Sequence, residues 1–131
     1  MPRQTLEQQR AADAWACSAP ARYRKEHVTV AKSLPALIAN SGLMQVLAYC
    51  QSKGDPYRTV ADDLRRWLVL SAHGPHDAAD FAAFMARLMQ VSPVEYQQLT
   101  AEAFAWLRWL RQIAPARQPA SASRHTPDQG A

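Results

Sequence analysis

The sequence predicts an all-α fold, a compact bundle of about five to six helices joined by short turns. Apolar residues recur at helical spacing along most of the chain, as at Leu34, Leu37 and Ile38. Alanine is frequent and β-branched residues are few, a composition that favours helices over strands. A chain of 131 residues with 48% hydrophobic residues is sufficient for one domain around a single core.

Start and stop signals divide the first half of the chain into three helices. Thr5 and Gln8 have the spacing of a capping box, in which each side chain bonds the backbone N–H of the other residue. The segment Asn40-Ser41-Gly42 predicts a tight turn, because glycine or asparagine accepts a positive φ at a helix end. The expected helices are residues 6–17, 22–39 and 43–53.

Proline and acidic residues mark the later helices. Asp55 is the expected N-cap of a fourth helix, with Pro56 at its first position, running to about Leu70. Asp77 is expected to cap a fifth helix, and Ser92 a sixth that reaches about residue 113. We expect one helical domain over residues 1–114. Residues 115–131, rich in proline, alanine and serine, are expected to be a disordered tail.

Composition limits the class of protein. No apolar run is long enough to span a membrane, and the polar N-terminus lacks the apolar core of a secretion signal, so we expect a cytoplasmic protein. Cys17 and Cys50 fall near apolar helical positions and are expected to be reduced and buried. The formal net charge of +4 is compatible with a polyanionic partner but does not require one.

The motifs of common enzyme classes are absent from the sequence. It contains no Gly-rich phosphate loop, no paired-cysteine zinc pattern and no Gly-x-Ser-x-Gly elbow. His73 and His76 lie three residues apart in a predicted loop, but no acid or thiol at suitable spacing completes a metal site. We therefore expect no metal, no cofactor and no catalytic activity. An enzyme that uses His73 or His76 remains the rival hypothesis.

Five basic residues are candidates for contact with a phosphate backbone. Lys25 and Lys32, seven residues apart, fall on the side of their helix opposite the apolar stripe. Lys53 lies in the last turn of the third helix. Arg58 and Arg65 share a stripe on the fourth helix. The alternative for all five is an ordinary solvated charge, and for the fourth helix an ion-pair ladder of Arg58, Asp62 and Arg66.

The last helix has an unusually broad apolar stripe. A broad stripe indicates contacts on more than one side, either inside the bundle or with another chain. Phe104 and Trp109 widen the stripe and Arg108 lies beside them, so these three are our candidate protein interface. For Arg108 the alternative is a favourable interaction with the C-terminal end of the helix dipole.

Three blocks of sequence, in order, carry a resemblance to a known family. They are TLEQQRAADAW, AKSLPALIANSGLMQVLAYCQSKG and EAFAWLRWLRQIA. Together they resemble the small subunit of the type III-B CRISPR effector, the Cmr complex, over about residues 5–113. Arginine stands where lysine is common in that family, and residues 71–91 match none of its motifs.

The resemblance implies a small helical subunit without catalytic activity or cofactors. Such subunits occur in several copies that stack beside the repeated backbone subunit, which holds the CRISPR RNA, and they help form the channel for the target RNA in antiviral defence. The implied partners are the backbone and large subunits, neighbouring copies of the small subunit, and the duplex of CRISPR RNA and target RNA. Lys32 and Lys53 fall within the matching middle block. Contacts from these residues to RNA phosphates would not depend on sequence, so the target would be selected by base pairing with the guide RNA.

A stand-alone helical regulator that binds nucleic acid is the alternative function. The short turn at Asn40-Ser41-Gly42 could belong to a helix-turn-helix. The helix that follows is mostly apolar, however, and offers few side chains that read base edges.

Overall fold

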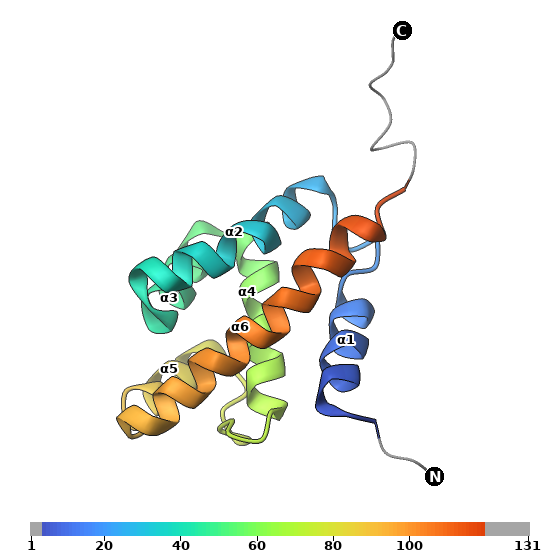
Figure 1. Ribbon diagram of the computed structural model, residues 1–131. Coiled ribbons are helices and arrows are strands. Elements are labelled where there is room, and N and C mark those ends of the chain that lie inside the picture. Colours follow the sequence, from blue (N-terminus) through green and yellow to red (C-terminus); the bar gives the residue numbers. More distant parts are fainter. Residues whose placement is uncertain (1–3, 120–131) are drawn as a thin grey trace, which may run out of the picture.

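The structure, a computed structural model, describes residues 4–119 and contains six α-helices and no strands within that range (Figure 1). This confirms the predicted all-α class and the number of helices. The helices are α1 Leu6–Cys17, α2 Lys25–Ser41, α3 Leu43–Lys53, α4 Tyr57–Leu70, α5 Phe81–Leu88 and α6 Pro93–Ala116.

Helix α6 is the central element of the bundle. It runs diagonally across the view of Figure 1 and packs against α1, α2 and α4. The broad apolar stripe predicted for this helix explains these contacts, because different sides of the stripe meet different neighbours. Its fully buried apolar side chains are Leu99, Ala103, Trp106, Leu107, Leu110 and Ala114.

Helices α2 and α3 form a hairpin through a single turn residue. Gly42 has φ 88°, a left-handed conformation that glycine adopts without steric cost, and its N–H donates to the carbonyl of Ile38. Ile38 and Leu43, on either side of this turn, are buried. The predicted helix break at residues 40–42 is therefore confirmed, and α3 returns along α2 to pack against α4.

Two of the predicted helix starts are confirmed in detail. The Thr5 hydroxyl accepts from the backbone N–H of Gln8 at 3.0 Å, and the Gln8 side chain accepts from the Thr5 N–H at 2.7 Å. Ser92 and Glu95 make the same reciprocal pair at the start of α6. Each box satisfies N–H groups that would otherwise lack a partner in the first turn.

Three other predicted starts were wrong by one to three residues. Helix α2 begins at Lys25, not Arg22, because residues 19–23 form a separate turn. Pro56, not Asp55, is the N-cap of α4, because the Asp55 carboxylate bonds Thr59, four residues further on, and not the nearer residues that an N-cap at Asp55 would bond. Asp80, not Asp77, caps α5 and accepts from the Ala83 N–H at 2.8 Å.

The end of α6 lies past the expected domain boundary at residue 114. The helix continues through Pro115 to Ala116. The Arg117 guanidinium then donates to the carbonyl of Trp15 at 2.6 Å, and the Gln118 amide donates to the carbonyl of Tyr23 at 2.8 Å. These bonds tie the first residues of the expected tail to the bundle. Residues 120–131 of that tail lie outside the described residues.

Candidate nucleic-acid interface

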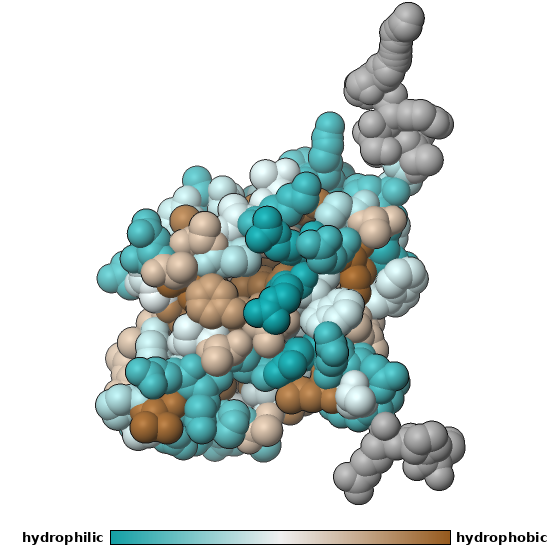
Figure 2. All heavy atoms as spheres, in the orientation of Figure 1, coloured by the Kyte–Doolittle hydropathy of each residue, from teal (hydrophilic) through white to brown (hydrophobic). Residues whose placement is uncertain are grey.

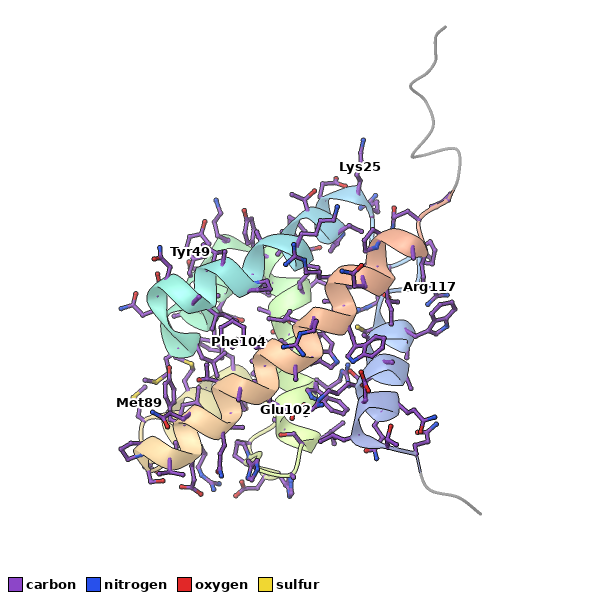
Figure 3. All side chains as sticks on the ribbon, in the orientation of Figure 1. Lys25, Tyr49, Met89, Glu102, Phe104 and Arg117 are labelled. Atoms are coloured by element: carbon purple, nitrogen blue, oxygen red, sulfur yellow. The ribbon has the colours of Figure 1, made fainter. Side chains whose placement is uncertain are left out.

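The two lysines of α2 are exposed on one side of that helix. Lys25 is its first residue and Lys32 lies two turns later, with the exposed Thr29 between them. Neither lysine has an ion-pair partner within residues 4–119. Figure 3 shows Lys25 at the outer edge of the molecule, pointing away from the bundle. Both ammonium groups are therefore free to contact an external anion.

Lys53 and Arg58 lie where α3 passes into α4. The Lys53 Nζ is 5.8 Å from the ring centroid of Tyr49 and 5.3 Å from that of Tyr57, distances typical of cation–π contacts. The exposed Arg58 guanidinium donates to the carbonyl of Gln51 through Nη2 at 2.7 Å and Nε at 3.1 Å. Neither cation is paired with a carboxylate in the described part of the chain.

The start of α2 and the turn between α3 and α4 are neighbours in space. His27, in the first turn of α2, places its Nε2 3.9 Å from the Asp55 carboxylate. The N–H of Arg24 donates to His27 Nδ1 at 3.1 Å, which leaves the other ring nitrogen toward Asp55. This contact brings the Lys25 end of α2 to the same side of the bundle as Lys53.

Arg65 is not placed with the other candidates. Its side chain is only 13% exposed, and it donates to the Asp62 carboxylate at 2.9 Å and to the carbonyl of Ala79. The ion-pair ladder of Arg58, Asp62 and Arg66, which was the alternative for α4, is also absent. Arg58 bonds a backbone carbonyl, and Arg66 pairs with Asp13 of α1. Tertiary contacts have replaced the i,i+4 pairs that the sequence suggested.

The three candidate interface residues fall on two sides of α6. Phe104 and Arg108 are one turn apart, and Figure 3 shows Phe104 in the space between α3 and α6. Figure 2 shows apolar side chains at the surface in this region, flanked by hydrophilic ones. Trp109 instead lines a hollow of about 230 Å³ against Glu7 and Ala11 of α1. Phe104, Arg108 and Trp109 therefore do not form one continuous surface on this chain.

The sequence analysis missed two buried carboxylates that join the helices. Glu102 accepts from Nε and Nη2 of Arg10, each at 2.7 Å, and from the indole N–H of Trp67 at 2.8 Å. Burial raises the pKa of Glu102, but the hydrogen bonds from Arg10 and Trp67 lower it by more than burial raises it. The pKa of Glu102 therefore lies below its ordinary value. Its place between the apolar positions Leu99 and Ala103 was the available signal.

Asp63 is the second carboxylate of this kind. It accepts from Arg22 at 2.6 and 2.8 Å and from the buried Tyr23 hydroxyl at 2.8 Å. Burial, followed by the charge of Asp63, raises the pKa of Tyr23, so this hydroxyl stays a donor. The pair joins α4 to the turn before α2. Asp63 itself is buried, whereas the Arg22 side chain is 45% exposed at the surface of the bundle.

The remaining reactive side chains do not form a catalytic group. Burial raises the pKa of the Cys17 thiol to about 12 and that of Cys50 to about 11, so neither is an activated nucleophile. His76 Nε2 lies 2.9 Å from the carbonyl of Ser71, whereas His73 lines a shallow hollow beside Arg10. Across residues 4–119 no three metal-ligating side chains gather.

None of the helices in residues 4–119 is both long and apolar enough to cross a lipid bilayer.

The fold and its surface define the class of the protein. It is a small helical bundle with exposed cations on α2, at the α3–α4 junction and on α6, while the buried carboxylates Asp63 and Glu102 are paired with arginines of other segments. Such an arrangement is typical of a binding or assembly subunit.

Comparisons with known proteins identify the family. The family described as CRISPR-associated protein (Cas_Cmr5) matches residues 6–117. The CRISPR system Cmr subunit Cmr5 of Thermus thermophilus is 33% identical over 94 residues, which are 71% of this chain and 75% of that protein. The chain therefore belongs to the Cmr5 family of CRISPR-associated proteins, the small subunits of the type III-B Cmr complex, and the resemblance of the three sequence blocks is confirmed.

A solved structure supports the fold. The crystal structure of a CRISPR-associated Cmr5 family protein, also from Thermus thermophilus, has a TM-score of 0.71 to this chain at 24% identity. The match covers 88% of this chain and 100% of the other. Cmr5 proteins are non-catalytic structural subunits, which agrees with the expectation drawn from the sequence.

Proposed function

We propose that this chain is built into a type III-B CRISPR effector in the cytoplasm as its non-catalytic small subunit. It stacks along the backbone and large subunits, next to further copies of itself, and forms part of the channel that holds the guide and target RNA in antiviral defence. The observation that carries this proposal is the family match over residues 6–117.

The free cations of the surface supply the RNA contact in this proposal. Lys25 and Lys32 contact phosphates from α2, and Lys53 and Arg58 do so from the α3–α4 junction. These contacts hold the RNA without reading its bases. Arg65 is already bonded to two protein acceptors, so we assign it to holding the segment between α4 and α5.

The protein contacts use the apolar surface of α6. Phe104 and Arg108 form one contact surface, and Trp109 with the adjoining side of α1 forms another. Two separate surfaces are what a subunit needs when it touches two neighbours in a stack. An apolar side chain ringed by polar ones is a common centre for such contacts.

A reconstituted effector tests the RNA contact. Lys25→Gln and Lys32→Gln each remove one unpaired charge, whereas the control Arg87→Gln removes one charge from an α5 residue that pairs with Asp77. The salt dependence of target-RNA binding is expected to weaken for the lysine variants, with a slope change of about 0.7 to 0.9 for each lost phosphate contact. The control is expected to leave the slope unchanged.

The role of the whole subunit is tested by leaving it out. An effector assembled without this chain is expected to bind target RNA more weakly. If the complex binds RNA equally well with and without it, the channel role is wrong.

The stand-alone regulator is the competing function. The exposed face of α3 offers only Gln45, Tyr49, Ser52 and Lys53 as polar or aromatic side chains. A recognition helix needs several side chains placed against base edges in the major groove. Sequence-specific binding of duplex DNA by the isolated chain would favour the regulator over the effector subunit.

A further inference from the structure

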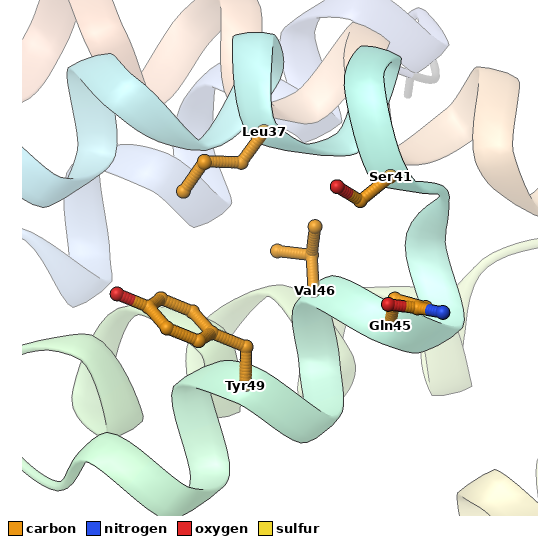
Figure 4. A pocket seen from close by; sticks show the side chains of 5 residues that line it. All are labelled: Leu37, Ser41, Gln45, Val46 and Tyr49. Carbon is orange, nitrogen blue, oxygen red and sulfur yellow. The ribbon is translucent and has the colours of Figure 1, made fainter.

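The hollow between α2 and α3 is the feature that the proposed function leaves unused. It has a volume of about 340 Å³ and is open to solvent on one side. Figure 4 shows Leu37 and Val46 facing into it, Ser41 directing its hydroxyl inward, and the ring of Tyr49 forming one wall. Gln45 completes the lining. The hollow is therefore apolar inside and carries a hydroxyl and an amide at the hairpin turn.

Tyr49 is exposed and yet held in place. Its side chain is 44% exposed, and its ring meets that of Tyr57 edge-on, with centroids 5.7 Å apart and an interplanar angle of 82°. Along α3 the pocket residues Gln45 and Val46 come one turn before Tyr49, and Lys53 comes one turn after it. The ring is supported from the Lys53 side and borders the hollow on the other.

The charge around the hollow favours a polyanion. None of its five lining residues is charged, Lys53 lies 5.8 Å from the centroid of the Tyr49 ring that borders it, and Arg58 bonds the carbonyl of Gln51 in the same helix. The carboxylate at this junction, Asp55, accepts from the Thr59 hydroxyl and faces His27. A flat apolar wall beside an unpaired cation is the combination that single-stranded nucleic-acid sites use.

We infer that the hollow binds one unpaired RNA base, which stacks on the ring of Tyr49 while Lys53 and Arg58 hold the adjoining phosphates. The Gln45 amide has both donors and an acceptor, and the Ser41 hydroxyl has one of each, so the site accepts more than one kind of base edge. This inference rests on the proposed function, because it assigns a base contact to a subunit whose other RNA contacts are to phosphates.

A partner side chain is the other occupant with the right shape. An apolar residue of a neighbouring subunit would fill the space between Leu37 and Val46 but would make no use of Lys53. The position of that lysine over two aromatic rings is the reason for preferring RNA. The experiment below separates the two occupants.

Binding and cross-linking in the assembled effector test the inference. Tyr49→Ala and Tyr49→Leu both remove the flat aromatic face, and the leucine keeps apolar bulk against Tyr57 in case the alanine variant is poorly folded. Loss of one stacked base is expected to weaken target-RNA binding by about 5- to 150-fold, with an unchanged salt slope. Tyr49→Phe is expected to bind as the parent chain does. Trp15→Ala, which removes an exposed aromatic near the other end of the bundle, is the matched control.

Lys53→Gln gives the complementary result. It is expected to lower the salt slope by about 0.7, the value for one phosphate of a single strand. Target RNA carrying 4-thiouridine at successive positions is expected to cross-link to the α3 peptide of the parent chain at one position, and not to the Tyr49→Ala variant.

The outcomes distinguish this inference from the proposed function. If Lys25→Gln and Lys32→Gln lower the salt slope while Tyr49→Ala and Tyr49→Leu bind RNA as tightly as Trp15→Ala, the base site is wrong and the channel role stands. If Tyr49→Ala instead releases the subunit from the effector, with RNA affinity unchanged in complexes that retain it, a protein side chain fills the hollow and the inference is overturned. If none of these variants changes RNA binding, both proposals fail.

Discussion

Glu102 makes a sharp prediction about what holds the bundle together. Its side chain is 9% exposed and accepts three hydrogen bonds, two from Arg10 of α1 and one from Trp67 of α4. Glu102→Gln keeps the shape but turns an NH₂ group toward the Arg10 guanidinium, so one donor faces another. The substitution therefore removes the charge that Arg10 pairs with and the bond from Arg10 Nη2, whereas the amide oxygen, placed at Oε2, keeps the bonds from Arg10 Nε and Trp67.

The size of the effect follows from these contacts. Removing one partner of a buried ion pair costs about 3 to 5 kcal/mol. The Arg10 side chain is 20% exposed and regains water, and the glutamine oxygen still accepts two of the three bonds, so we expect the smaller cost of about 2 to 3 kcal/mol. In a domain of this size, each kcal/mol of lost stability lowers the midpoint temperature of unfolding by about 4 °C. The expected decrease for Glu102→Gln is therefore about 8 to 12 °C.

The dependence on pH gives the prediction its signature. The pKa of Glu102 in the folded chain lies below its ordinary value of 4.5, because the bonds from Arg10 and Trp67 outweigh the effect of burial. A lowered pKa contributes stability that is fully present above pH 4.5 and is lost as the pH falls through the folded value. The difference between the parent chain and Glu102→Gln is therefore expected to shrink below pH 4.5, because glutamine does not titrate.

Thermal unfolding followed by circular dichroism from pH 7 to pH 2 measures this difference. Glu26→Gln is the matched control, since Glu26 is exposed on α2 and has no ion-pair partner in residues 4–119; its expected change is within about 0.5 kcal/mol. The reasoning is refuted if Glu102→Gln unfolds together with the control at pH 7, or if its deficit is the same at pH 2 as at pH 7.

Three further predictions concern the thiols, a helix start and a turn. Cys17 and Cys50 are expected to resist iodoacetamide in the folded chain and to react fully in denaturant, because burial raises both pKa values; mass spectrometry showing native labelling would contradict this. Ser92→Ala is expected to cost about 1 kcal/mol in urea unfolding, because it removes the acceptor for the first turn of α6, and Ser92→Thr is the control. Gly42→Ala is expected to cost about 1 to 2 kcal/mol in the same assay, because φ is 88° there while the added methyl meets only the Tyr96 hydroxyl at 3.8 Å; an unchanged urea midpoint would disprove the strain.

The sequence by itself determined the local features of this protein. Apolar spacing gave the six helices, and short-range hydrogen bonds gave the starts of α1 and α6 at Thr5 and Ser92. These features depend on residues within four positions of one another, so no knowledge of the fold was needed. The order of three sequence blocks was enough to predict the family.

The predictions from local sequence were wrong where several nearby polar residues could make the same contact. Asp77 and Asp80 both suit an N-cap, and only the packing of α5 selects Asp80. Asp55 suits one as well, but its carboxylate bonds Thr59. The arginines of α4 show the same effect, since Arg66 reaches Asp13 on α1 rather than a neighbour on its own helix.

Only the tertiary structure decided which charges are used internally and which are free. Arg10 and Glu102 are 92 residues apart in the sequence, and nothing local to either residue predicts that they meet. The same holds for Arg22 and Asp63, 41 residues apart. Folding pairs a carboxylate with whichever cation and donor the helices bring to it, because an unpaired buried charge is too costly to keep. The lysines of α2 and the ring of Tyr49 stay available to a partner because no helix of the described bundle packs over them.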